Sequence, residues 1–437
     1  MSQGQPNIIL FLTDDHARWA LPGYGNSALH APNLSALGAR GTVYEDAYTP
    51  SPVCSPARAS LMTGLMPSQH GVHDFLASHP KFNDKNWLEG IPTLATALNA
   101  AGYRCGLAGK WHISMDDMPP AGFESWFALN GEYPIHHDGD NGFSRDGVEE
   151  RVVGNLTDTI TQGALDFLGQ NDGRPYFLVV GYYATHSPWR DQPSRLLDLY
   201  ADHDFAEIDQ QNAEAPGLLN VELPDAEESE RRAARKNYYA AVSHIDEGVG
   251  QVLAAGSTMD TLVIYTSDHG LSLGQHGIWG KGNATRPQNL LDSNIRVPLI
   301  MAGPGIPIGQ RRAGFFDHTD THQVILAAAG LDHRPLPDVK DMQFCEYGTA
   351  RMVRTQSLKL VPWTTGAPSQ LYSVDAPGEV LMDHRSDPVL RSLVLDLERA
   401  VTDFFARHAD PARSGPESLK PGRFNYNQAW DTFVPRA

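Results

Sequence analysis

The chain has 437 residues, of which 41% are apolar and 20% are charged, a composition typical of a folded protein with a large buried core. Its formal net charge of -18 argues against nucleic-acid binding, which relies on a basic surface. The three cysteines, Cys54, Cys105 and Cys345, are too few and too widely spaced for a disulfide framework. No leader sequence or long apolar span precedes Asn7, so we expect a cytoplasmic protein without a membrane segment.

Four apolar runs along the chain each end in a polar cluster. The runs over 7–13, 103–108, 175–183 and 261–266 are short and continuous, as expected of strands buried on both faces. The clusters that follow them are, in the same order, Asp14-Asp15, Lys110 with His112, His186, and Asp268-His269. Because ligands bind beyond the carboxyl ends of the strands in open parallel sheets, we expect these side chains to share one site.

Helical patterns alternate with the apolar runs. We expect helices over 31–41, 91–101, 157–170, 230–255 and 319–329, the fourth capped by Ser229. A strand or bend is expected over 43–48, and the last clear central strand over 297–303. This alternation predicts an α/β fold with a large, mostly parallel central sheet covered by helices on both faces. Residues 113–150 and 190–228 show no clear period and are predicted to be irregular inserts.

The pattern changes at about residue 338. Short strands are expected over 344–349, 351–355, 357–361 and 371–374, followed by a helix over 388–408. We therefore predict two domains, a larger α/β domain over 1–337 and a smaller C-terminal subdomain over 338–437, built from an antiparallel sheet and a helix.

The stretch from Pro50 to Gly64 surrounds Cys54 with prolines, small residues and Arg58. Pro56 fits the first turn of a helix, so Cys54 is expected at a helix N-terminus, where unpaired N–H groups favour an anion. Arg58 follows about one turn later and can reach the same place. A cysteine in this setting has a lowered thiol pKa or is a target for modification.

The predicted site combines charges of both signs. Asp14, Asp15 and Asp268 offer carboxylates, the hard oxygen ligands that suit Ca²⁺ or Mg²⁺. The opposite charge comes from Arg58, Lys110, His112, His186 and Lys281. Clustered carboxylates and cations are what a metal-assisted attack on a tetrahedral oxyanion requires.

Taken together, these motifs resemble those of the type I sulfatases, the formylglycine-dependent branch of the alkaline phosphatase superfamily. Cys54-Ser55-Pro56-Ala57-Arg58 is similar to their C-x-P-x-R modification signature. The remaining motifs fall in the family's order over roughly residues 7–303; they are Asp14-Asp15, Gly109-Lys110-Trp111-His112, His186, Ser267-Asp268-His269-Gly270 and Trp279-Gly280-Lys281-Gly282. His269 departs from the asparagine that many members carry, and Leu65 stands where an arginine often follows.

The resemblance implies that a formylglycine-generating or sulfatase-maturating enzyme oxidises Cys54 to formylglycine, a protein-derived cofactor whose hydrate is the nucleophile. It also implies a bound Ca²⁺, with Mg²⁺ or Mn²⁺ as alternatives, held by Asp14, Asp15, Asp268, His269 and the modified Cys54. Lys110, His186 and Lys281 would bind the sulfate ester, and His186 or Lys281 would assist the leaving alcohol. His112 would deprotonate the second hydroxyl of the hydrate, and Arg58 would hold the modified residue in place.

The implied activity is hydrolysis of a small organic sulfate ester, as in arylsulfatases. One alternative is a phosphonate monoester or phosphodiester hydrolase with the same nucleophile, although Asp14-Asp15 favours a sulfatase, since those enzymes tend to carry one acid there. The other is a non-enzymatic anion- or metal-binding protein in which Cys54 stays a thiol. The sequence leaves open whether the chain forms a homo-oligomer.

Overall fold

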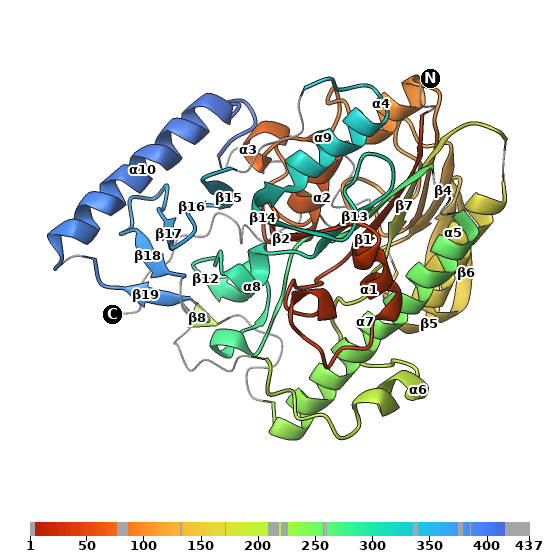
Figure 1. Cartoon of the computed structure of the whole chain (residues 1–437), viewed down its shortest axis with the longest axis horizontal. Helices are drawn as coiled ribbons and strands as arrows, with labels where there is room; N and C mark the ends of the chain where they lie inside the picture. Colours follow the sequence, from red (N-terminus) through yellow and green to blue (C-terminus); the bar gives the residue numbers. More distant parts are fainter. Residues whose placement is uncertain are drawn as a thin grey trace.

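The computed structural model describes residues 5–76, 86–131, 133–170, 172–208, 218–219, 226–256, 258, 260–334, 340–374, 379–384 and 386–415. Within these residues, a ten-stranded sheet carries helices on both faces, and a five-stranded sheet lies beside it (Figure 1). In the part of the chain that is described, none of the helices combines the length and apolar character needed to cross a membrane.

The large sheet is centred on four parallel strands. Its order is β14 (Gln310–Asp317), β2 (Thr42–Tyr48), β13 (Leu299–Ala302), β9 (Thr261–Ser267), β1 (Asn7–Thr13), β7 (Tyr176–Gly181), β3 (Arg104–Gly109), β4 (Ser125–Leu129), β5 (Asp138–Arg145) and β6 (Val148–Asn155). Leu10 of β1 pairs in parallel with Val179 of β7 and with Ile264 of β9. The four strands β9, β1, β7 and β3 are therefore neighbours that end at the same edge.

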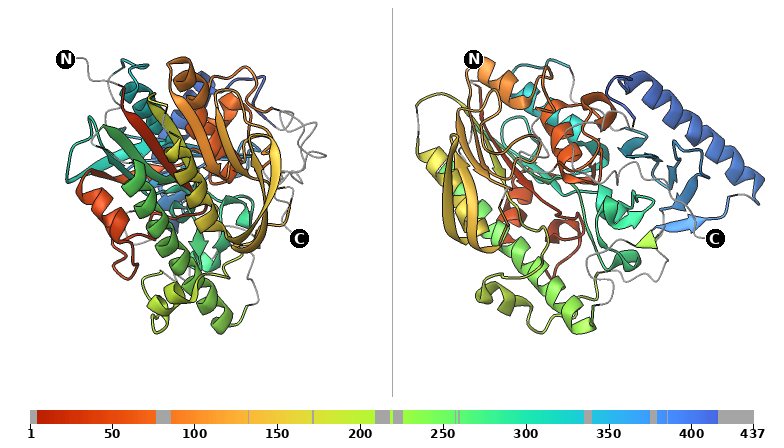
Figure 2. Two further views of the ribbon diagram at one scale, coloured as in Figure 1. Left: turned by 90° about the vertical axis from the view of Figure 1, so that its right-hand side faces the viewer. Right: turned by 180° about the vertical axis from the view of Figure 1, so that it is seen from behind.

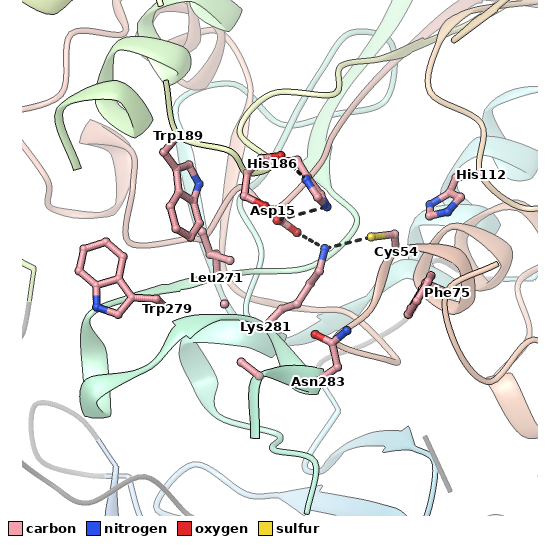
Figure 3. Close-up of a pocket in the computed structure, with 13 residues that line it drawn as sticks. Asp15, Cys54, Phe75, His112, His186, Trp189, Leu271, Trp279, Lys281 and Asn283 are labelled. Atoms are coloured by element: carbon pink, nitrogen blue, oxygen red, sulfur yellow. Dashed lines mark hydrogen bonds and ion pairs between the residues drawn. The ribbon is translucent and has the colours of Figure 1, made fainter. Parts of the chain in front are cut away.

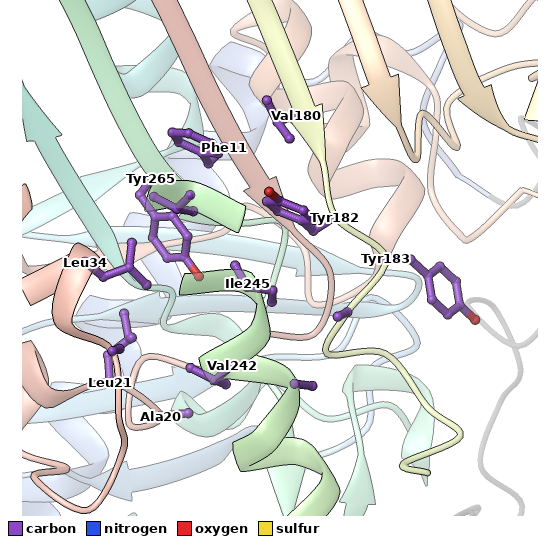
Figure 4. Packing of buried hydrophobic residues seen from close by; sticks show 14 of the residues in the cluster. Phe11, Ala20, Leu21, Leu34, Val180, Tyr182, Tyr183, Val242, Ile245 and Tyr265 are labelled. Carbon is purple, nitrogen blue, oxygen red and sulfur yellow. The ribbon is translucent and has the colours of Figure 1, made fainter. Parts of the chain in front are cut away.

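Helices cover the two faces of this sheet in separate groups (Figure 2). One face packs against α1 (Pro32–Ala39), α5 (Leu156–Gly169) and α7 (Glu228–Gly256), and the other against α2 (Cys54–Thr63), α4 (Leu94–Ala100) and α9 (His318–Ala328). Ile9 and Phe11 of β1 join the first core, whereas Ile8 and Leu10 join the second, as the two-residue period of a strand requires. Figure 4 shows Phe11 and Tyr265 beside Val242 and Ile245 of α7.

The five-stranded sheet is antiparallel, as expected. It consists of β15 (Gln343–Tyr347), β16 (Ala350–Arg354), β17 (Leu358–Val361), β18 (Gln370–Ser373) and β19 (Val380–Met382). The helix α10 (Pro388–His408) packs on it through Val394, Leu397, Val401 and Phe405. The domain boundary that we expected between residues 337 and 338 lies outside the described residues, so the division remains a prediction.

Short elements complete the chain between these layers. They are α3 (Pro67–His70), α6 (Ser194–Leu197), α8 (Asp292–Ile295), β8 (Leu218–Leu219), β10 (Ser272–Leu273), β11 (Trp279–Gly280) and β12 (Thr285–Arg286). Asp292 links α8 to the five-stranded sheet, because Arg354 of β16 forms an ion pair of 3.0 Å with it.

Two expectations about the elements were wrong, and an edge strand was missed. Residues 113–150 are not an irregular insert, because they contain β4, β5 and the start of β6. The polar and glycine-rich composition of β5 hides a strand, yet Asp146-Gly147 is a two-residue hairpin signal, and both residues have the positive φ that such a turn needs. Ser229 lies inside α7 and does not cap it. The strand at 297–303 is central as expected, but β14, which follows it in the chain and lies at the edge of the sheet, was missed.

Candidate active site

The ends of the four central strands bring their polar clusters together. Asp14 and Asp15 follow β1, and Lys110 follows β3, close to the end of β7. The backbone N–H of Lys110 donates to the carbonyl of Gly181 at 2.7 Å. A Cβ at Gly181 would lie 2.4 Å from the Lys110 carbonyl oxygen, so only glycine allows the two strand ends to approach this closely.

Cys54 is the first residue of α2, as predicted, and its side chain is buried. Its Sγ lies 3.2 Å from Nζ of Lys281 and 3.4 Å from Nε2 of His269. Figure 3 shows Cys54 and Lys281 facing each other at the cavity, with Asp15 and His186 beside Lys281. Burial and Asp14 raise the pKa of the Cys54 thiol, but Lys110, Lys281 and His269 outweigh them and hold it well below its ordinary value.

Each carboxylate of the site faces a cation. Lys110 pairs with Asp14, Lys281 Nζ lies 2.8 Å from Asp15 Oδ1, and Arg58 Nε lies 2.8 Å from Asp268 Oδ2. The three pairs together contain three negative and three positive side chains, all of them buried or nearly buried. The site thus balances its own charge in a low-dielectric setting, where an unpaired charge is costly.

The electrostatic environment separates the two acids Asp14 and Asp268. Burial alone raises the pKa of Asp14, but Lys110, His186, Lys281 and Arg58 hold it well below its usual range. For Asp268, burial and the neighbouring Asp14 prevail and raise the pKa to about 6. Burial lowers the pKa of His269, yet the adjacent Asp268 raises it to about 9. A group of strongly shifted pKa values of this kind is typical of functional sites.

The two histidines His112 and His186 are held in different hydrogen-bonding states. His112 Nε2 donates to the carbonyl of Leu76 at 2.7 Å, which leaves Nδ1 as the acceptor atom, buried and without a hydrogen-bond partner among the described residues. Burial and Lys110 lower the pKa of His112, which keeps the ring neutral. His186 instead uses Nδ1 to donate to the Ser187 carbonyl at 2.7 Å, so its Nε2 faces Asp15 Oδ2 at 3.9 Å.

Four of the predicted ligand residues fit a divalent cation. Ligand atoms of Asp14, Asp15, Cys54 and His269 all lie within 4.8 Å of one another. Asp14 Oδ1 is buried without a hydrogen-bond partner among the described residues, as expected of an atom that binds a cation. Asp268 lies beside this group, where its oxygens accept from Arg58 and from the backbone N–H groups of Asp15 and His269.

A cavity of about 350 Å³ opens onto these side chains. Its reactive end is formed by Asp15, Cys54, His112, His186 and Lys281, and the rest of its described lining by Phe75, Ser187, Trp189, Leu271, Trp279, Gly280, Asn283 and Ala284. Lys110 and Asp14 lie behind this lining. The cavity is thus a cleft with a charged floor and largely apolar walls, as small-molecule sites commonly are.

Supporting residues of the site were missed by the sequence reasoning. Asp15 has a positive φ of 59°, and its carbonyl accepts hydrogen bonds from Tyr238 (2.8 Å) and Thr185 (3.0 Å). The hydroxyl of Tyr183 lies 3.1 Å from His186 Nδ1. Tyr238 lies on the buried side of α7, within the helix predicted over 230–255. The one available signal was its phenol, which needs a polar partner when buried.

Comparisons with known proteins identify a family for most of the chain. A family model described as Sulfatase matches residues 6–331. The choline-sulfatase of Rhizobium meliloti (strain 1021) is 31% identical over 350 residues, which cover 71% of this chain and 65% of that protein. The chain therefore spans slightly less than two thirds of the length of this relative.

Two solved structures share the fold. A protein in complex with its substrate D-glucosamine-2-N,6-O-disulfate is 20% identical, with a TM-score of 0.77 over 93% of this chain and 99% of that one. The phosphonate monoester hydrolase of Agrobacterium radiobacter is 19% identical, with a TM-score of 0.72 over 92% of this chain and 96% of that one. At these identities the likeness concerns the fold alone.

Proposed function

The chain belongs to the sulfatase family of the alkaline phosphatase superfamily, and on this basis we propose that it hydrolyses an organic sulfate monoester to an alcohol and inorganic sulfate. The observation that carries the proposal is the position of Cys54. It starts α2 at the charged floor of the cavity, with Lys281 and His269 within 3.4 Å of its sulfur. A cysteine that only filled the core would not need a lysine and a histidine next to its sulfur.

The proposed nucleophile is formed when a maturating enzyme, using an oxidant of its own, converts the Cβ–SH group of Cys54 to the aldehyde of formylglycine, with loss of the sulfur. Its hydrate supplies two hydroxyls, one to attack sulfur and one to allow release of sulfate, which a cysteine or serine ester lacks. The proposed cation is Ca²⁺, with Mg²⁺ or Mn²⁺ as alternatives, and it would be held by Asp14, Asp15, His269 and the modified residue, with Asp268 next to them. When bound, it supplies positive charge to the sulfuryl oxygens and the nucleophile.

The residues of the chain then divide the remaining tasks. Lys110 and Lys281, which pair with Asp14 and Asp15, neutralise the charge of the sulfuryl oxygens. His186, whose Nδ1–H donates to Ser187, acts as the imidazolium. Its Nε2–H faces the cavity and passes a proton to the leaving alcohol as the S–O bond breaks, with Lys281 as the alternative donor. His112 accepts a proton at Nδ1, the atom left unprotonated by the bond to Leu76, when sulfate is released.

The test uses protein produced together with a maturating enzyme. Mass spectrometry of the peptide that contains Cys54 should show the aldehyde, and the protein should release sulfate from a panel of sulfate esters, whereas Cys54→Ala should release none. An intact thiol in fully active protein would overturn the proposed nucleophile. Absence of hydrolysis for every ester, in protein shown to carry the aldehyde, would overturn the proposed activity.

A phosphonate monoester hydrolase is the second candidate, since one solved structure of this fold carries that activity. Both substrates are tetrahedral oxyanions, so the same charged floor could bind either. Comparing kcat/KM for an aryl sulfate and for the phosphonate of the same phenol decides between them, because the leaving group is held constant. We expect the sulfate to be preferred, and a large preference for the phosphonate would reverse the assignment.

A further inference from the structure

The wall of the cavity on the side of His186 is built from two tryptophans. The ring centroids of Trp189 and Trp279 lie 5.9 Å apart, with the rings inclined at 54°. In the view of Figure 3 they lie on one side of Lys281, and Cys54 and Phe75 lie on the other. A leaving alcohol that takes its proton from His186 would therefore extend along the two indole rings.

Both rings are fixed by the surrounding structure. The indole N–H of Trp189 donates to the carbonyl of Thr185 at 3.2 Å, next to the loop that carries His186. Trp279 belongs to β11 and pairs with Leu273 of β10. Between them, Leu271 is anchored by its carbonyl, which accepts from Trp19 Nε1 at 3.1 Å. A rigid apolar surface of this kind binds a flat ring at a low entropic cost.

A buried cation lies behind one of the two rings. The guanidinium of Arg235, in α7, lies 5.2 Å from the centroid of Trp279, and the residue is 4% exposed. Trp279 is among the described residues that line the cavity and Arg235 is not, so we place the ring of Trp279 between the charge of Arg235 and the cavity. Its partner Glu228 is paired at 3.2 Å, but that carboxylate is 71% exposed, where water screens its charge.

This arrangement disfavours a positively charged leaving group. A cation bound on the cavity face of Trp279 would share the ring with Arg235 and meet Lys281 nearby. Asp15 is the one carboxylate among the described lining residues, and it is already paired with Lys281. Beyond the reactive end, Ser187 and Asn283 are the polar side chains of the described lining, which is a poor match for a sugar with hydroxyls around its ring.

We infer that Trp189 and Trp279 form the leaving-group subsite, and that Arg235 behind Trp279 makes this subsite select an uncharged aromatic alcohol over a quaternary ammonium alcohol. This inference rests on the proposed function, because it assigns the alcohol part of the sulfate ester. Trp189 and Trp279 are specificity-determining residues in direct contact with substrate. Arg235 acts on the substrate only through the ring of Trp279.

The first experiment isolates the charge. Choline and dimethylbutanol, its uncharged carbon isostere, are compared as competitive inhibitors of the mature enzyme. We expect dimethylbutanol to bind more tightly, and Arg235→Gln to narrow the ratio of the two inhibition constants by roughly threefold to tenfold. Arg235→Lys, which keeps the charge, should keep the ratio. Tighter binding of choline, or a ratio unchanged in Arg235→Gln, would overturn the role of Arg235.

The second experiment isolates the rings. We expect Trp189→Leu and Trp279→Leu each to weaken inhibition by naphthol about tenfold, while inhibition by inorganic sulfate changes less than about twofold. Trp279→Phe should retain most of the naphthol affinity, which separates ring contact from a folding defect. Equal losses for naphthol and sulfate, or no loss for naphthol, would overturn the subsite. A sulfated sugar preferred over naphthyl sulfate would overturn the aromatic assignment.

Failure of this inference can be told apart from failure of the proposed function. Binding of naphthol and choline is also measured by calorimetry with Cys54→Ala, which needs neither turnover nor the aldehyde. If the mature enzyme hydrolyses sulfate esters but these affinities do not depend on the tryptophans, only the subsite is wrong. If naphthol binds at the tryptophans but no ester is cleaved, the proposed function is wrong.

Discussion

Arg58 and Asp268 are 210 positions apart in the sequence, yet Arg58 Nε lies 2.8 Å from Asp268 Oδ2 and both side chains are buried. Arg58 stands one turn after Cys54 in α2, and its Nη1 also donates to the carbonyl of Lys110 at 2.9 Å. This single side chain therefore ties the helix of Cys54 to the ends of β9 and β3. On this geometry we propose that Arg58 positions Cys54 instead of acting on substrate.

Replacing Arg58 should cost stability as well as activity. Arg58→Met leaves the buried Asp268 without its cation, and breaking a buried pair in this way costs about 3–5 kcal/mol in the free energy of unfolding. Arg174→Met is the matched control, because Arg174 pairs with Glu124 at 2.8 Å on the surface and should cost less than about 1 kcal/mol. Urea denaturation of the wild type and the two variants measures both losses of stability. Equal losses would show that the Arg58 pair contributes no more than a surface pair.

The assignment of the two histidines predicts opposite kinetics. In the mature enzyme, His112→Gln should leave the attack on sulfur largely intact and slow the release of sulfate. A rapid burst of alcohol should therefore precede a steady rate reduced by about 10²–10⁴-fold. Stopped-flow measurement of an aryl alcohol, together with a separate assay of free sulfate, records the two phases.

His186→Gln is the control for this assignment. Because His186 faces the leaving alcohol through Nε2, its loss should slow release of the alcohol itself and abolish the burst. The effect should be largest for alcohols of high pKa, which need the proton most. A burst in His186→Gln and none in His112→Gln would exchange the two roles.

The outcome for the fold shows where sequence patterns are informative. The run Asn7–Thr13 and the helix Pro388–His408 were predicted with the bounds that the structure has, because each has a strong apolar period and clear polar ends. The strand Asp138–Arg145 was missed, because five of its residues are Asp, Gly or Asn and its pairing depends on β4 and β6. Strand formation there is decided by tertiary neighbours, which local propensity does not contain.

The same distinction applies to the site. Polar residues directly after buried strands were placed at one sheet edge correctly, because parallel strands share the direction in which they end. The tryptophans Trp189 and Trp279 could not be assigned this way, since one comes from a loop and the other from the short strand β11, and their contact depends on the path of the whole chain. Arg235 is also beyond local reasoning, because its burial behind Trp279 follows from the packing of α7.

Calcium should stabilise the folded protein through the Asp14–Asp15 cluster. A ligand present at 100 times its dissociation constant adds about 2.7 kcal/mol to the free energy of unfolding, which appears as a rise in Tm. Asp14→Asn should lose this rise, because it removes the charge of the carboxylate whose Oδ1 is buried without a partner among the described residues. Thermal denaturation with calcium and with a chelator measures the shift.

The matched control for calcium is the exposed group His203, Asp204 and Glu207, whose ligand atoms are also mutually close. Asp204→Asn should keep the full rise in Tm, since exposed acidic groups bind cations weakly without a buried cage. If Asp204→Asn abolishes the rise and Asp14→Asn does not, calcium binds at the surface group.

The N-terminus of α9 predicts a pH-dependent difference in stability. Asp320 is 5% exposed, and burial together with the neighbouring Asp317 raises its pKa to about 7, against the opposing effect of Lys340. Between the ordinary value of 3.8 and this value, the folded chain keeps a proton that the unfolded chain has released. The free energy of unfolding therefore falls as pH rises, and the contribution of Asp320 is fully present below pH 3.8 and lost above about pH 7.

Asp320→Asn removes this titration while its side-chain oxygen can still accept from the backbone N–H of Asp317, a bond of 2.8 Å in the wild type. The stability of the wild type relative to the variant should thus decrease by about 2–4 kcal/mol between pH 4 and pH 8. Asp317→Asn should behave oppositely, because Lys340 and its hydrogen-bond donors hold the pKa of Asp317 far below its usual range despite burial. The contribution of Asp317 to the free energy of unfolding is lost as pH falls. Urea denaturation across pH, comparing the wild type with each variant, should therefore give pH slopes of opposite sign for the two differences in stability. Slopes of the same sign would contradict the assigned charge state of Asp320.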